Sequence, residues 1–148
     1  DKMIAMTRFS ATDSLADVAI AKAKVKEGIY KIQINDVKLR LKMLLNNEMD
    51  AMFLPQPQAT TALLHNHKEI ADSAFSRTHV GVIAFRKKAM EDNRRKQQLK
   101  SFVKAYNEAC DSINKYGIGS YADVIKKYTE ADNKTIKALP KLNYKHAK

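Results

Sequence analysis

Apolar residues in the first half of the chain fall into short runs separated by turn signals. Lys2–Met6 and Ile29–Ile34 predict strands, because the second of these runs is dense in residues that favour a pleated, half-buried surface. Met49–Leu54 predicts a buried strand that Pro55 ends, since proline cannot donate a ladder hydrogen bond. These three runs are the predicted strands of the first half.

Segments with the helical period lie between and after these runs. Thr12 or Asp13 is a suitable N-cap for a first helix, which we expect to end near Gly28. Asp36 can cap a second helix, and Ala59–Leu64 begins a third. Strict alternation of strand and helix predicts an α/β fold, with a mostly parallel sheet flanked by helices.

The second half of the chain is predicted to be helical after one further strand at His79–Phe85. Two short helices are expected at Tyr121–Tyr128 and Asn133–Leu139, followed by a frayed tail after Pro140. A long amphipathic helix precedes them, with an apolar stripe made of Leu99, Phe102, Val103, Tyr106, Cys110 and Ile113. We therefore expect an α/β domain over residues 1–85 and a helical segment over residues 86–148.

Composition indicates a globular protein. The chain has 148 residues, the length of one ordinary domain, and 45% of them are apolar. No apolar run approaches the roughly 20 residues needed to cross a bilayer. The single cysteine, Cys110, excludes an intramolecular disulfide, and its place in the apolar stripe predicts a buried helix position.

The chain is strongly basic, with 27 Lys and Arg against 16 Asp and Glu and a net charge of +11. Its densest basic stretch, Arg86–Lys104, is the best candidate for a nucleic-acid surface. That stretch runs into an amphipathic helix, and no aromatic residue interleaves its basic core to stack on bases. We favour a solvated helix face and expect no nucleic-acid partner.

Two loops are candidates for ligand binding, because ligands of open α/β sheets sit beyond the carboxyl ends of the strands. Ser10–Ser14 places hydroxyls and backbone N–H groups at a helix start. Leu54–Gln58 combines two prolines with two uncharged amides. Ordinary helix capping and an ordinary proline turn remain equally good readings of the two loops.

Nothing in the sequence indicates catalysis. His65 and His67 have no cysteine or carboxylate at a convincing metal-ligand spacing, and surface positions suit them better. No nucleophile elbow, zinc-protease helix, phosphate-binding lysine loop or dinucleotide glycine pattern occurs. We expect no catalytic residue, no metal and no cofactor, and hence a protein that is not an enzyme.

One segment resembles a known family. Met43–Pro57 contains a helix end, a short turn, Asp50-Ala51, a strand and a Pro-x-Pro sequence. This order resembles the type 2 solute-binding proteins of ABC transporters, most of all the nitrate, sulfonate, taurine and thiamine-pyrimidine-precursor branch. Gln56 stands where relatives often carry an acidic residue, which disfavours a cationic ligand.

The resemblance implies the second lobe, with C-terminal helices, of a periplasmic or extracytoplasmic receptor, lipid-anchored in some full-length forms. Such a receptor closes on a small polar or anionic solute and delivers it to an ABC permease. Ser10 and Thr12 match the loop of the second lobe that faces the cleft, and Gln56 and Gln58 match the cleft loop after the Asp-Ala strand. Asp50 is interpreted as structural.

The resemblance further implies that a first lobe precedes Asp1 and completes the site. The helices after Phe85 would then pack on that lobe, and without it we expect a homodimer or an exchanged segment. Three other functions stay open: the effector lobe of a transcription regulator with the same fold, a related pyrimidine-precursor synthase, which lacks a supporting cysteine cluster, and a basic nucleic-acid-binding protein.

Overall fold

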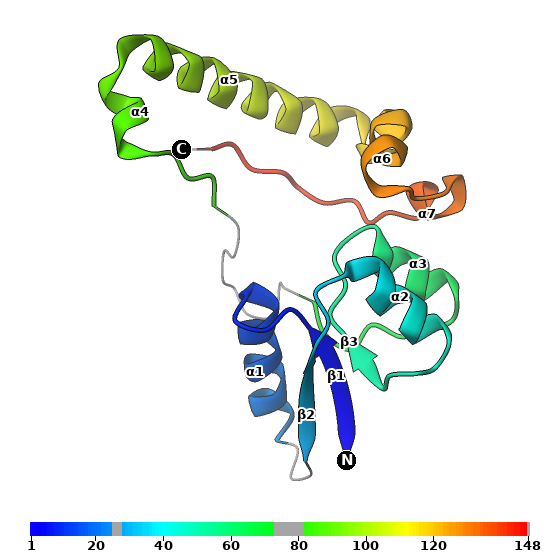
Figure 1. The fold of residues 1–148 in the computed structure, drawn as a ribbon. Helices are drawn as coiled ribbons and strands as arrows, with labels where there is room; N and C mark the ends of the chain where they lie inside the picture. The colour runs from blue at the N-terminus through cyan, green and yellow to red at the C-terminus, as the bar shows by residue number, and fades with distance from the viewer. Residues whose placement is uncertain (25–27, 73–81, 148) are drawn as a thin grey trace. The chain divides into compact units, whose positions relative to one another are not determined.

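The computed structural model describes residues 1–24, 28–72 and 82–147 and divides the chain into two compact units, Asp1–Val80 and Gly81–Lys148 (Figure 1). In the described part of the first unit, strands and helices alternate strictly. They are β1 (Lys2–Met6), α1 (Ala11–Ala23), β2 (Ile29–Gln33), α2 (Val37–Leu45), β3 (Ala51–Met52) and α3 (Gln58–Leu64). The expected β-α-β-α-β-α order is confirmed.

The three strands form one parallel sheet in the order β2-β1-β3. The chain passes from β1 to β2 in one direction and from β2 to β3 in the other. Because such crossovers are right-handed, the reversal places α1 and α2 on opposite faces of the sheet. Figure 1 shows α1 apart from the α2–α3 pair, with the strands between them.

The core of the first unit is centred on β1. Ala5 and Met6 are neighbours in this strand and therefore point to opposite faces, yet both are 0% exposed. Both faces of the central strand are thus covered by protein, as a parallel sheet requires. Leu15 and Ala16 of α1, Ala62 of α3 and Met49 before β3 are also buried.

Helix α2 begins as the sequence predicts. The Asp36 carboxylate accepts hydrogen bonds from the backbone N–H groups of Lys38 and Leu39 at 2.8 and 3.1 Å. The chain leaves the helix through Asn47, whose φ of 58° is left-handed. These two caps fix the ends of α2 relative to β2 and β3.

Helix α1 differs from the prediction at both ends. Its N-cap is Ser10 and not Thr12 or Asp13, because the Ser10 hydroxyl accepts the N–H of Thr12 and leaves Asp13 free for other partners. The helix ends at Ala23, where Lys24 adopts a left-handed φ of 50°, well before Gly28.

Strand β3 is shorter than the expected Met49–Leu54. At the start of the expected strand, the side chain of Asp50 bonds β1 in place of the backbone. Its Oδ2 accepts the N–H of Met3 at 2.9 Å, and its Oδ1 accepts from Lys2 Nζ at 2.8 Å. Pairing to β1 continues for only one more bond, from Phe53 N to Ala5 O at 2.9 Å. The structural interpretation of Asp50 is confirmed.

The expected strand at His79–Phe85 is not found where it can be tested. Residues 79–81 lie outside the described residues, and residues 82–85 carry neither helix nor strand. Val82 is 86% exposed, so the apolar run is not buried as a strand of a covered sheet would be. Residues 81–85 belong to the second unit.

The described part of the second unit is helical. Its elements are α4 (Lys87–Glu91), α5 (Asn93–Tyr116), a short 3-10 helix (Ile118–Tyr121), α6 (Ala122–Thr129) and α7 (Asn133–Lys137). Asp92 caps α5 and Asp132 caps α7. Cys110 is 3% exposed, so its predicted buried position on the long helix is confirmed.

The C-terminal tail is held in place along α5, contrary to the expected fraying. Asn114 donates from Nδ2 to Tyr144 O at 2.8 Å and accepts the Tyr144 N–H at 2.9 Å. Asn107 accepts the N–H of Ala147 at 2.8 Å. Two asparagine amides therefore bind the extended tail as a neighbouring strand would.

Replacing Asn114 with alanine should release this tail. Both bonds to Tyr144 are lost together, and at about 1 kcal/mol each they predict amide exchange in residues 141–147 that is roughly tenfold faster or more. Hydrogen-exchange mass spectrometry of the C-terminal peptide measures the change. Ser101→Ala, at an exposed position of the same helix, is the matched control, and equal protection in both variants would contradict this role of Asn114.

Candidate functional site: the carboxyl edge of the sheet

The carboxyl ends of the three parallel strands meet at one edge of the first unit, and the chain order reverses about β1. The loop after β1, residues 7–10, leads to α1, and the loop after β3, residues 53–57, leads to α3. Strands β1 and β3 are direct neighbours. The two loops singled out from the sequence therefore start from adjacent strands at a switch point, the usual ligand position in open α/β sheets.

Ser10 and Thr12 lie together in the first loop, but their hydroxyl groups serve the loop itself. Ser10 Oγ donates to Thr7 O at 2.5 Å and accepts the N–H of Thr12 at 3.2 Å. Thr12 Oγ1 lies 2.9 Å from Ser10 Oγ and 3.3 Å from Thr7 O, so its proton also has a partner. Neither hydroxyl holds a spare proton for an anion.

The backbone at the start of α1 is similarly occupied. The N–H groups of Asp13 and Ser14 both donate to Ser10 O, at 3.1 and 3.2 Å. The Thr12 N–H bonds Ser10 Oγ, so these three donors are used within the first turn of the helix. In this structure the Ser10 loop acts as a capping motif.

Asp13 is the most densely bonded carboxylate described at this edge. It is 7% exposed, and its Oδ2 accepts from Arg8 Nε at 3.0 Å and from the N–H of Phe9 at 2.8 Å. Its Oδ1 accepts from Lys31 Nζ at 2.6 Å. The bond from Lys31 and the bond from the Phe9 N–H lower the pKa of Asp13 from 3.8 to about 2.

The Asp13 network joins three elements. Lys31 lies on β2 and bonds Asp13 and Asp17 of α1, each at 2.6 Å, and these carboxylates raise the pKa of Lys31. Arg8 comes from the loop after β1. Because two cations meet two carboxylates here, the network is balanced in charge and is built for structure.

Gln56 and Gln58 lie in and after the second loop. Gln56 is exposed, and its Oε1 accepts the N–H of Thr60 at 3.2 Å and the Thr60 hydroxyl at 2.7 Å. These bonds use the amide oxygen, so the NH₂ group is the end of Gln56 that suits a ligand contact. Gln58 is the half-buried first residue of α3.

The sequence interpretation missed Arg40. This residue of α2 is 3% exposed, and its Nε and Nη1 are buried without a hydrogen-bond partner. A signal was present in the sequence, because Arg40 falls between Val37 and Leu44 at the helical spacing of the apolar face. A cation on an apolar helix face is unusual, because burial of a charge is unfavourable unless the charge is paired.

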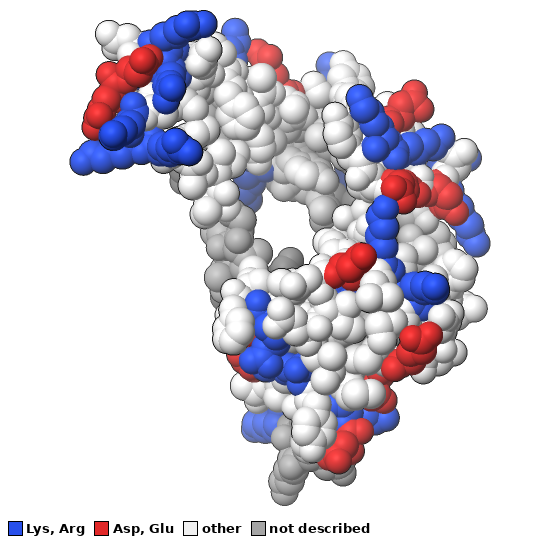
Figure 2. Space-filling model, viewed as in Figure 1, with Lys and Arg blue, Asp and Glu red and all other residues white. Residues whose placement is uncertain are grey.

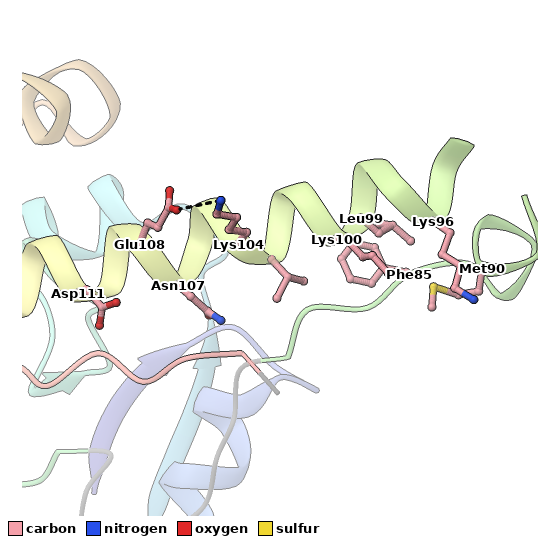
Figure 3. A pocket seen from close by; sticks show the side chains of 10 residues that line it. Phe85, Met90, Lys96, Leu99, Lys100, Lys104, Asn107, Glu108 and Asp111 are labelled. Carbon is pink, nitrogen blue, oxygen red and sulfur yellow. Dashed lines mark ion pairs between the residues drawn. The ribbon is translucent and has the colours of Figure 1, made fainter. Parts of the chain in front are cut away.

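The second unit contains a separate apolar groove of about 620 Å³ along α5 (Figure 3). Leu99 and Val103 line it together with Phe85, whose ring meets that of Phe102 edge-on at 6.1 Å. Lysines 96, 100 and 104 also line it, and Lys104 Nζ lies 3.8 Å from Glu108. Part of the predicted apolar stripe of α5 is thus accessible.

The basic side chains of the stretch Arg86–Lys104 are exposed. Figure 2 shows Lys and Arg side chains grouped over α4 and the start of α5. Exposed side chains of this stretch are Arg86, Lys87, Lys88, Arg94, Arg95, Lys96, Lys100 and Lys104. The predicted solvated helix face is confirmed as an exposed surface.

Neither metal binding nor a membrane span is indicated for the part of the chain that the structure describes. Within it, no group of three or more His, Cys, Asp or Glu side chains is arranged to hold a metal ion. His65 is exposed and His67 is half-buried. None of the described helices has both the length and the apolar character that crossing a bilayer demands.

Comparisons of the chain with protein-family models, with curated proteins and with solved structures found no match.

Proposed function

We propose that this chain is the ligand-binding second lobe of a type 2 solute-binding protein that serves an ABC transporter. It binds a small polar or anionic solute without transforming it and presents that solute to a permease on the extracytoplasmic side of the membrane. The observation that carries this proposal is topological. The reversal of strand order about β1 brings the Ser10 loop and the Gln56 loop to neighbouring strand ends.

The chemistry of the chain supports binding over catalysis. The Gln56 loop offers an amide NH₂ group, which recognises a solute but does not attack it. The net charge of +11 favours the approach of anions by long-range attraction. Gln56 supplies an uncharged NH₂ donor in the loop where an acidic side chain would instead select cations.

A solute screen tests the proposal. Thermal shift and calorimetry on the gene's full-length product, with nitrate, taurine, ethanesulfonate, aminopyrimidines and flavin-like compounds, should reveal one saturable ligand. At a concentration a hundred times the Kd, that ligand raises the stability by about 2.7 kcal/mol. Solute binding linked to specific, saturable binding of one duplex would favour the regulator function.

The screen also has an outcome that contradicts the receptor. Salt-sensitive binding to arbitrary duplex DNA, with no response to any solute, would indicate a nucleic-acid-binding protein that acts through the basic face over α4 and α5. Conversion of an aminopyrimidine into a product would make the protein an enzyme.

A further inference from the structure

Arg40 presents a buried guanidinium that the described structure does not neutralise. It is the fourth of the nine residues of α2, and both its Nε and its Nη1 are buried without a hydrogen-bond partner. Only 3% of the residue's surface is accessible. Buried polar groups in folded proteins almost always have hydrogen-bond partners, so the guanidinium of Arg40 is an exception.

Because Arg40 is charged, the absence of a partner destabilises the fold. A guanidinium does not lose its proton in a protein, so it stays cationic after burial. Burial lowers the pKa of Arg40, and the carboxylate of Asp36 opposes that effect through space. Asp36 Oδ1 is engaged in capping α2, where it accepts the N–H groups of Lys38 and Leu39. A buried cation without a bonded anion is strongly destabilising.

Arg40 lies in the first turn of α2, near the candidate site. Only three residues separate the end of β2 from the start of α2, so the first turn of α2 lies at the carboxyl edge of the sheet. Side chains on a helix lean toward its N-terminus, and from Arg40 that direction leads back to the same edge. Two further cations at this edge, Arg8 and Lys31, are paired with Asp13.

We propose that the guanidinium of Arg40 receives the anionic group of the solute, a small oxyanion such as a sulfonate or a carboxylate. The inference rests on the proposed function for the identity of the ligand. The planar fork of a guanidinium binds two oxygens of such a group at once, and burial strengthens the pairing. Arg40 then selects anionic solutes over neutral ones of the same shape.

The test compares Arg40→Met with Lys42→Met in the full-length product. Lys42 is an exposed cation on the same helix, so its replacement makes the same change in charge away from the buried face. With ethanesulfonate as the probe, Arg40→Met should lose roughly 100-fold or more in affinity, while Lys42→Met should keep it. Without anion, Arg40→Met should melt above the wild type, because a buried unpaired charge is gone.

Equal ethanesulfonate affinity in the wild type and Arg40→Met would overturn the inference. If Arg40→Met fails to fold, Arg40→Lys provides the measurement, with an expected loss of about tenfold because the fork is absent. If the wild type binds an aminopyrimidine but neither a sulfonate nor sulfate, the proposed receptor function stands and this role of Arg40 is excluded.

An independent signal separates the two proposals. In wild-type protein, the Nε–H resonance of Arg40 should shift in a saturable way on addition of sodium sulfate, and it should not shift with sodium chloride at equal ionic strength. A sulfate-dependent shift in a protein that binds none of the screened solutes would support an anion site at Arg40 and contradict the transport-receptor function. No shift with sulfate or with ethanesulfonate overturns the role of Arg40.

Discussion

Replacing Asp13 with asparagine is expected to lower the melting temperature of the first unit by roughly 5–10 °C. The carboxylate accepts from Lys31 Nζ at 2.6 Å, from the N–H of Phe9 at 2.8 Å and from Arg8 Nε at 3.0 Å. An amide of the same shape has one acceptor oxygen and no charge, so it leaves these cations without their main counter-charge at a 7% exposed position. Circular dichroism melting curves of the two proteins measure the difference.

Asp17→Asn is the matched control for this substitution. Asp17 bonds the same Lys31 Nζ at 2.6 Å, but its side chain is 65% exposed. Exposed ion pairs contribute little, so the control should change the melting temperature by no more than about 2 °C. An equal drop in both variants would mean that Lys31 alone, and not the buried network around Asp13, stabilises the first unit.

The same pair of proteins should show a pH dependence of known sign. The pKa of Asp13 falls from 3.8 to about 2 on folding, so the ionised group stabilises the fold at pH values above 3.8. That contribution is lost as pH falls through about 2. The melting temperatures of wild type and Asp13→Asn should therefore converge at acid pH. A gap that stays constant over this range would contradict the role of the Asp13 charge.

The sequence predicted the elements whose signals are local. Asp36 capped α2 as expected because an acceptor side chain before an apolar helical pattern has few alternatives. The three parallel strands followed from the alternation of the two periods. The buried position of Cys110 followed from the stripe on the long helix.

Features that depend on contacts between distant residues were not predictable in this way. Asp13 looks like an N-cap in sequence, but its carboxylate bonds Lys31, 18 positions away, and Ser10 is the N-cap. Asp50 shortens β3 by bonding Met3, which lies 47 positions away. The tail after Pro140 looked frayed because its partners, Asn107 and Asn114, are on a helix far earlier in the chain.

The candidate site shows the same limit. The two loops could be chosen from the sequence because strand ends and helix starts are local signals, and the fold brings them to neighbouring strands. Their chemistry could not be chosen, because a hydroxyl that caps and a hydroxyl that binds a ligand have the same sequence. Only the bonds from Ser10 Oγ and Thr12 Oγ1 to Thr7 O distinguish the two roles. These bonds occupy the hydroxyls of the Ser10 loop, whereas Nε and Nη1 of Arg40 have no hydrogen-bond partner.

The largest loss of stability is expected from Met6→Ala. Met6 is on the central strand and is 0% exposed, the largest side chain described as fully buried. Truncation to alanine removes apolar contacts and leaves a cavity in a sheet covered on both faces, which costs roughly 3 kcal/mol or more. For a unit of this size, that loss lowers the melting temperature by well over about 10 °C. Urea denaturation, with an unchanged m-value, should report the same loss.

Met3→Ala supplies the control for Met6→Ala within one strand. Met3 has the same side chain and pairs with Tyr30 in the same sheet, but it is 41% exposed. Because exposed apolar surface forms no closed cavity, its truncation should cost less than about 1 kcal/mol. Comparable losses at both positions would show that β1 is not the covered centre of the sheet, and the topological argument for a site beside β1 would fall with it.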